Sequence, residues 1–114
     1  MPINLLRSLT AIVRQIPDKQ TVAYRARSSG AGNVDGYAAA VNFTARHGPI
    51  TSGDFDGMEK SWCTWHLYAL DGQVVSPERL GKITDAAGVV WHVLSATSSF
   101  GGLKHDCVCV QEVS

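Results

Sequence analysis

Apolar residues near the start of the chain recur at helical spacing. Steps of four, three and four residues put them on one side of an α-helix. The stripe consists of Leu5, Leu9, Ile12 and Ile16, widened by Leu6 and Val13. Asn4 can cap the first turn, and Pro17 disfavours helical geometry at the residue before it, so the pattern predicts an amphipathic helix over 3–16. This helix must pack its apolar side on the rest of the chain.

Beyond Pro17 the pattern changes to the alternation that is typical of β-strands. The strongest run is Ser61 to Leu70. Its two sets of side chains are Cys63, Trp65, Leu67 and Ala69 on one face and Trp62, Thr64, His66 and Tyr68 on the other. Thr21 to Arg27 and Tyr37 to Arg46 are weaker runs of the same kind. Asp71-Gly72 has the form of a two-residue turn, which predicts a returning strand over Gln73 to Ser76.

The clearest hairpin signal lies between Lys82 and Ser95. Asp85 and Gly88 bracket a pair of small residues, as in a type I turn, so Lys82 to Asp85 and Val89 to Ser95 are expected to run antiparallel. Another β run, His105 to Val113, follows a Gly-Gly turn.

The segment Thr51 to Lys60 has neither periodicity, and its two glycines and three acidic residues predict a loop. The chain is therefore expected to form one domain over 1–114, with a helix over 3–16 and a β-rich barrel-like region over 20–114 that carries the loop 51–60. The fold class is α+β, mainly antiparallel β, with a small barrel-like sheet and one N-terminal amphipathic helix.

The amino-acid composition limits the classes of function that this chain can have. Ten basic and ten acidic residues give a formal net charge of zero, so no global field points to nucleic acid or a membrane surface. Three cysteines are an odd number, and the first fifteen residues lack the pattern of a secretory signal. We expect reduced thiols in a protein made in the cytoplasm. No membrane partner is expected, because no apolar run approaches the roughly 20 residues that span a bilayer.

Cysteine and histidine supply the most reactive candidate cluster. His105, Cys107 and Cys109 share one face of a strand, and Cys63 and His66 lie on another strand. Zinc binds these residue types, but structural zinc sites draw close pairs from tight turns, whereas residues two apart in a strand are about 6.5–7 Å apart. Core cysteines are the favoured interpretation, with no metal or cofactor. A small metal-binding or thiol-dependent domain remains the alternative from another class.

No catalytic residue is predicted. Cys107 or Cys109 could be paired with His92 or His105, but no oxyanion turn accompanies them, so the chain is not expected to be an enzyme. The carboxylates Asp54, Asp56 and Glu59 do not complete a calcium-loop pattern. A basic ridge of the kind found in single-strand binders would comprise Arg25, Arg27 and Arg46 with Tyr24 and Phe43 between them. The neutral net charge argues against that ridge.

Two stretches resemble the small head-tail connector proteins of tailed bacteriophages, the head-closure or stopper type also described as head-tail joining adaptors. One is the helix that leads into Gln20-Thr21-Val22-Ala23-Tyr24-Arg25. The other is Lys82-Ile83-Thr84-Asp85-Ala86-Ala87-Gly88-Val89-Val90-Trp91-His92-Val93-Leu94. In that family the second stretch takes the form of a hairpin whose turn contains Asp and Gly.

The resemblance implies a structural virion protein without catalytic residues. A barrel-like module of this family forms a homo-oligomeric ring at the head-tail interface and lines the channel through which genomic DNA leaves, without sequence recognition. Its partners are the portal or adaptor and the tail proteins of the same virion. A tail terminator or another tail-side ring protein is the alternative in the same class.

The predicted loop 51–60 is the expected partner-binding segment. Phe55 and Met58 are its apolar anchors, flanked by Asp54 and Asp56. An aromatic ring and a thioether beside charged residues suit the core of an interface. The other interpretation is that Phe55 folds back and plugs the end of the barrel.

Overall fold

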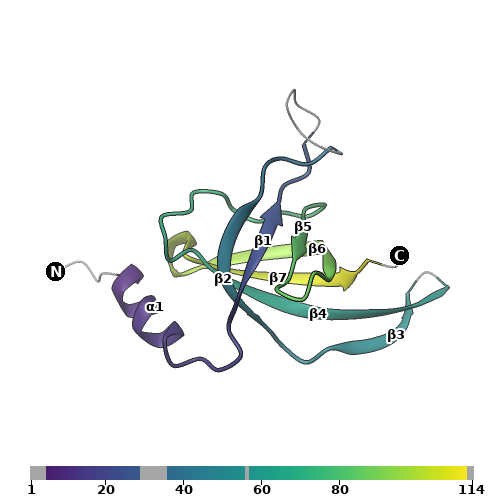
Figure 1. Ribbon diagram of the computed structural model, residues 1–114, viewed down its shortest axis with the longest axis horizontal. Helices are drawn as coiled ribbons and strands as arrows, with labels where there is room; N and C mark the ends of the chain where they lie inside the picture. The colour runs from purple at the N-terminus through teal and green to yellow at the C-terminus, as the bar shows by residue number, and fades with distance from the viewer. Residues whose placement is uncertain (1–4, 29–35, 56, 113–114) are drawn as a thin grey trace.

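The computed structural model describes residues 5–28, 36–55 and 57–112 (Figure 1). Its elements in chain order are α1 (Leu5–Val13), β1 (Gln20–Arg25), β2 (Val41–His47), β3 (Thr51–Phe55), β4 (Met58–Tyr68), β5 (Lys82–Thr84), β6 (Val90–Ser99), the 3-10 helix η1 (Phe100–Gly102) and β7 (Lys104–Gln111). Six of the strands form a closed barrel in the order β2-β1-β5-β6-β7-β4, because β4 pairs back to β2. Every pairing is antiparallel. The predicted fold class is confirmed.

Alternating side chains of the barrel strands fill its interior. The largest are Tyr24, Phe43, Trp65, Leu67, Ile83 and Trp91. The rings of Trp65 and Trp91 meet edge to face with centroids 6.2 Å apart. Burying each such side chain stabilises the fold by roughly 1.5–3 kcal/mol, so closure of the barrel supplies most of the apolar stabilisation.

Helix α1 packs outside the barrel, against the other face of β4. Leu9 and Val13 are buried with Tyr68 in a second, smaller cluster. The prediction that Ile12 belongs to the packed apolar side of the helix is wrong, because Ile12 is 53% exposed. The helix also ends at Val13 and not at Ile16, since the chain tightens into i→i−3 hydrogen bonds ahead of Pro17. The start of the predicted helix 3–16, including the proposed cap Asn4, lies outside the described residues.

The hairpin predicted around Asp85 is confirmed. The Asp85 carboxylate accepts the backbone N–H groups of Ala87 and Val89 on Oδ1, both at 2.9 Å, and the indole N–H of Trp91 on Oδ2 at 3.1 Å. Gly88 ends the turn with φ 85°, a conformation that glycine adopts without strain. A single carboxylate therefore ties the β5–β6 turn to a buried core side chain.

The segment expected to be a loop at 51–60 is a hairpin, so that prediction is wrong. β3 pairs with the start of β4 from Thr51 opposite Trp62 to Phe55 opposite Met58. Gly57, just before β4, has φ 77°, a conformation that glycine adopts without strain. The Trp62 ring lies against Gly53, 3.0 Å from where a Cβ atom would stand. A cross-strand aromatic ring thus compensates for the low β-propensity of glycine.

The strand predicted over Gln73 to Ser76 does not form. Both edges of β4 at Tyr68 are already occupied, by Thr44 of β2 and by Lys104 of β7, so a returning strand finds no edge to pair with. The side chain of Gln73 instead donates to the carbonyl of Asn42 at 2.7 Å.

Candidate functional site

The Cys/His row predicted on one strand face points into the barrel. His105, Cys107 and Cys109 of β7 are all buried, and Cys63 of β4 is directly opposite Cys109. His66, the fifth candidate ligand, lies on the opposite face of β4 from Cys63 and binds Asp106 instead. Among the residues that the structure describes, no group of three or more potential ligands could hold a metal ion.

Burial holds the three thiols in their protonated form. It raises the pKa of Cys63 to about 11 and that of Cys107 to about 12, and it raises the pKa of Cys109 further. The thiol of Cys109 donates to the carbonyl of Cys107 at 3.4 Å. Because the thiolate is the nucleophile, these thiols are inert core residues.

The histidines are also engaged in structural contacts. His105 is hydrogen-bonded to Ser98 Oγ at 2.8 Å, and burial lowers its pKa. His92 lies on the other face, where its Nε2 is 3.0 Å from Glu112. His92 therefore does not form a nucleophile–base pair with Cys107 or Cys109.

His66 and Asp106 form the shortest charged contact outside the core. His66 Nδ1–H donates to Asp106 Oδ1 at 2.6 Å, and Lys104 Nζ is 3.6 Å from the same oxygen. Partial burial alone raises the pKa of Asp106, but the hydrogen bond from His66 and the charge of Lys104 outweigh it and lower that pKa. The contact joins the register partners of the neighbouring strands β4 and β7.

The expected partner-binding residues lie on a projecting hairpin, which we call the arm: β3 together with Met58–Ser61 of β4 (Figure 1). Asp54 is exposed, and Met58 is 51% exposed. Phe55 lies in β3, but its side chain is outside what the structure describes, as is Asp56 altogether. β3 is paired with β4 alone among the described strands, so its outer edge is open.

The basic ridge that the sequence analysis disfavoured does not form with Tyr24 and Phe43. Tyr24 and Phe43 are buried in the core at 1% exposure each, so neither can stack on a ligand. Three cationic side chains instead lie near the ring of another aromatic residue, Tyr37. Lys82 Nζ is 4.3 Å from its ring centroid, and the guanidinium carbons of Arg27 and Arg25 are 5.1 and 5.7 Å away.

This cluster depends on long-range pairing that a linear pattern does not reveal. Arg27 forms an isolated bridge with Tyr37, and Arg25 of β1 is opposite Lys82 of β5. Arg25 donates hydrogen bonds to the backbone carbonyls of Ala38 at 2.8 Å and Tyr37 at 3.2 Å. These bonds hold the segment that precedes β2 against the end of β1. The sequence offered only one signal, which was the Arg-x-Arg spacing at the end of β1.

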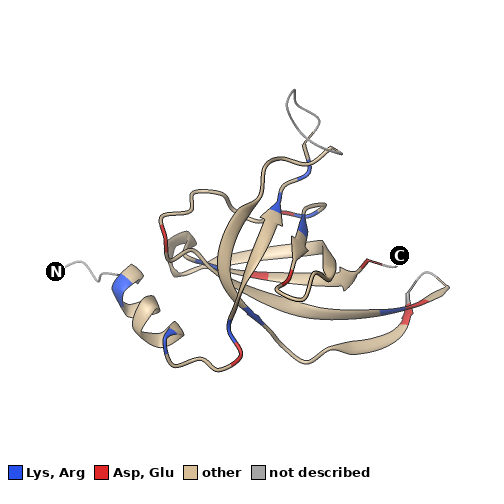
Figure 2. Cartoon of the chain, in the orientation of Figure 1, with Lys and Arg blue, Asp and Glu red and all other residues tan. Residues whose placement is uncertain are grey.

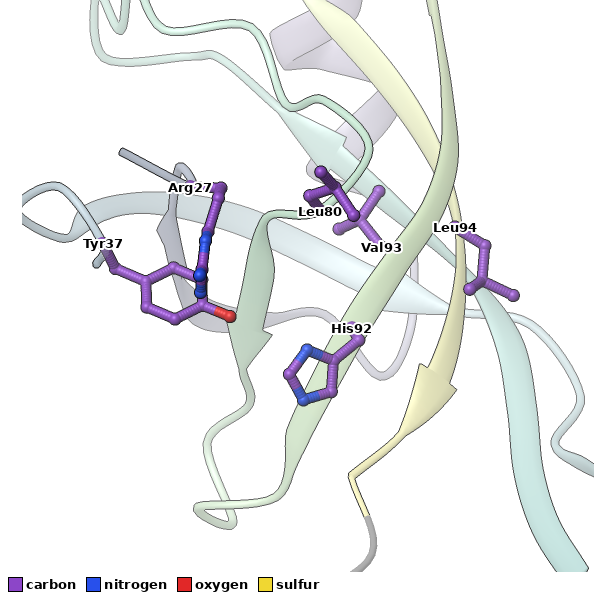
Figure 3. Close-up of a pocket in the computed structure, with 6 residues that line it drawn as sticks. All are labelled: Arg27, Tyr37, Leu80, His92, Val93 and Leu94. Atoms are coloured by element: carbon purple, nitrogen blue, oxygen red, sulfur yellow. The ribbon is translucent and has the colours of Figure 1, made fainter. Parts of the chain in front are cut away.

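A shallow pocket of about 310 Å³ opens beside the Tyr37 ring (Figure 3). It is lined by Arg27, Tyr37, Leu80, His92, Val93 and Leu94. Leu80 is 59% exposed and has a φ of 76°, which is uncommon for leucine. The pocket therefore combines a cationic, aromatic side with an apolar side.

Charged residues are spread over the molecule (Figure 2). Arg25, Arg27 and Lys82 gather at Tyr37, and Asp54 and Glu59 lie beside Lys60 on the arm. No helix in the described part of the chain is long and apolar enough to cross a membrane.

Comparison with known proteins adds little to this geometry. No protein-family model and no curated protein matches the chain. One solved structure with a similar chain is the virion of a native gene transfer agent (GTA) particle. The TM-score is 0.47 and the identity 19%, over 83% of this chain and 93% of that chain. Function is therefore argued from the residues and geometry of this chain.

Proposed function

We propose that this protein is a structural component of a tailed-phage virion, which assembles into a ring at the head-tail junction and joins the portal or adaptor to the tail. One observation carries the proposal: an arm of two strands leaves a closed barrel and keeps the outer edge of β3 unpaired among the described strands. Closed barrels otherwise remove strand edges.

An arm of this kind gains stability from a partner. A two-stranded hairpin is marginal by itself in water, and the barrel interior does not take up Met58, which is 51% exposed. Docking the arm on another protein pairs or covers its edge and buries that thioether. A rigid barrel with one projecting arm can repeat the same contact from copy to copy, which closes into a ring when the rotation allows.

Two further features support a structural role. The thiols are buried and protonated, and the histidines of the described residues are held by Ser98, Asp106 and Glu112 or, in His47, by hydrogen bonding at the backbone of Gly48. The stretch that resembles head-tail connectors, Lys82 to Leu94, forms the hairpin with an Asp/Gly turn that the resemblance implies. The DNA channel of such a ring would be lined without base recognition.

Phe55 and Met58, with Asp54 and Asp56 beside them, are the interface residues of this proposal. The competing interpretation of Phe55 is a plug for the barrel end. The Phe55→Ser variant separates them, because an interface residue can be replaced with near-normal melting and lost assembly. A plug residue would cost about 2–4 kcal/mol of unfolding free energy instead.

The test of the function is a binding experiment with the full chain and the portal, adaptor and tail-tube proteins encoded beside its gene. We expect a complex with portal or adaptor, seen as rings by electron microscopy, that Phe55→Ser and Met58→Ser weaken. Ile12→Ser is the matched control, since Ile12 is 53% exposed but lies on α1, away from the arm. Binding to the tail tube alone would indicate a tail terminator, and binding to none of these proteins would contradict the proposal.

A further inference from the structure

The arm carries a pair of like charges in direct opposition. Asp54 of β3 and Glu59 of β4 are register partners across the hairpin, and both are exposed. Like charges directly opposite each other destabilise an antiparallel pair. Lys60, the next residue of β4, is half-buried and is opposite Gly53. The arm therefore presents an acidic pair that a cationic partner would stabilise.

The barrel carries a cluster of positive charges around Tyr37. Arg25 and Lys82 are register partners, and Arg27 joins them around one aromatic ring. Within the described part of the chain, no carboxylate lies within ion-pair distance of Arg27 or Lys82. The ring face offsets part of the repulsion between the cations, but it supplies no formal negative charge.

The apolar groups of the two places differ in how they lie. Met58 is 51% exposed but pairs with Phe55, so it projects from the other face of the arm than Asp54 and Glu59, whereas Leu80 is 59% exposed next to the cations. Leu80 and Leu94 line the pocket of about 310 Å³ beside Tyr37 (Figure 3). Glu112 is engaged with His92, another residue of the pocket lining.

We infer that the arm of one copy docks on the Tyr37 site of the next copy, where the Tyr37 site is Arg27, Tyr37 and Lys82 with the pocket beside them. Asp54 and Glu59, on one face of the arm, then face Arg27 and Lys82. The inference rests on the proposed ring function and names the contact that builds the ring.

A second copy is favoured over other occupants for two reasons. Both halves of the contact are present on one chain, with opposite charge. The arm also extends away from β1 and β5, the strands that carry Arg25 and Lys82, so the two halves do not meet within one copy (Figure 1). A contact between two different patches is heterologous, and repeating it generates a closed ring or a filament. A nucleic acid phosphate backbone is the competing occupant of the cations.

Charge reversal on each side tests the docking. Arg27→Glu changes an exposed residue of the site, and the double variant Asp54→Lys, Glu59→Lys changes exposed residues of the arm. Self-association is measured by sedimentation velocity on the full chain from about 1 μM to 1 mM, because assembly follows mass action. Each variant alone should associate at least about tenfold more weakly than the wild type.

Mixing the two variants should restore association to near the wild-type level, because the basic arm then meets an acidified site and the acidic arm meets a basic one. The reversals Arg14→Glu and Asp71→Lys, at exposed positions elsewhere, are the controls and should change nothing. Thermal melting of every variant shows that each one is folded.

The failures of this docking and of the ring function are distinguishable. Association that survives both reversals overturns the docking and leaves the ring proposal in place. A wild-type chain that stays monomeric also overturns the docking, and it overturns the ring proposal only if portal and adaptor binding fail too. If Arg27→Glu abolishes retention of a single-stranded or duplex DNA probe, while arm reversal is without effect and the mixture is not rescued, the occupant is nucleic acid.

A crosslink locates the contact. Ser52→Cys in one copy, on the same face of the arm as Asp54 and Glu59, and Leu80→Cys in another should form an intermolecular disulfide under mild oxidation. Leu80→Cys mixed with Ile12→Cys is the control, since Ile12 is also exposed but lies on α1. The native thiols are buried and protonated, so they give little background. Equal yields from the two mixtures would contradict the docking.

Discussion

The molecule contains two hairpins with an aspartate and a glycine near the turn, and they differ in what surrounds them. In β5–β6, Asp85 accepts three hydrogen bonds, one of them from the indole of the buried Trp91. In β3–β4, Asp54 is exposed and is opposite another carboxylate, Glu59. The first hairpin is part of the closed barrel, and the second extends beyond it.

The difference shows that turn chemistry creates a hairpin, whereas its neighbours decide what the hairpin does. β5 and β6 each pair with strands on both sides, so their backbone groups are satisfied within the fold. β3 has one neighbour among the described strands and depends on cross-strand contacts such as Trp62 on Gly53. The β5–β6 hairpin therefore stabilises the fold, and the arm is available for a partner.

The largest expected effect comes from removing a core side chain of the barrel hairpin. Trp91→Ala deletes a ring that is 2% exposed and packs on Trp65, so it should cost about 3–5 kcal/mol of unfolding free energy. Met58→Ala on the arm is the matched apolar truncation and should stay within about 0.5 kcal/mol. Urea denaturation measures both, and equal losses would show that the arm belongs to the same cooperative core.

The next effect compares the two aspartates. Asp85→Ala removes the acceptor of two turn N–H groups and leaves the Trp91 indole N–H without a partner, which should cost about 2–4 kcal/mol. Asp85→Asn keeps one carbonyl acceptor and should cost less. Asp54→Ala should be neutral or slightly stabilising, since it relieves like-charge opposition. A loss at Asp54 as large as that at Asp85 would remove the distinction between the hairpins.

The sequence was sufficient where local chemistry and tertiary pairing agree. The Asp85 turn and the alternation of Ser61 to Leu70 predicted real elements, because the residues that shape them locally also face the core. The loop prediction for 51–60 failed because glycine and aspartate lower β-propensity, and only Trp62 on the opposite strand compensates. The strand at 73–76 failed because other strands already occupy the edges of β4.

The Tyr37 site shows why surface sites are harder to predict than turns. Its residues come from β1, β5 and the chain returning toward β2, and their convergence depends on register. The sequence offered Arg25 and Arg27 only in a disfavoured ridge whose aromatic members, Tyr24 and Phe43, point into the core. Asp54 and Met58 are exposed on the arm, and their role at an interface stays a prediction.

Acid should weaken the barrel through His105. Burial lowers the pKa of His105, so the unfolded chain binds its proton more readily than the folded protein does. Stability from this residue is present above the unfolded pKa of about 6.5 and is lost as the pH falls below it. Urea midpoints at pH 7.5 and 5.5 measure the loss, and His105→Gln should reduce the difference. An unchanged difference in that variant would assign the effect to other groups.

The smallest expected effect is confined to the arm. Glu59→Lys replaces the carboxylate opposite Asp54 with a cation, which should stabilise that cross-strand pair by about 0.2–1 kcal/mol. Because the arm can open locally without unfolding the barrel, global denaturation should hardly change. Hydrogen exchange of the amides in β3 should slow, while exchange in β6 stays the same. The same substitution should weaken association with a second copy, since it removes one of the two carboxylates that face Arg27 and Lys82. A more stable arm that also associates more tightly would contradict the docking on Tyr37.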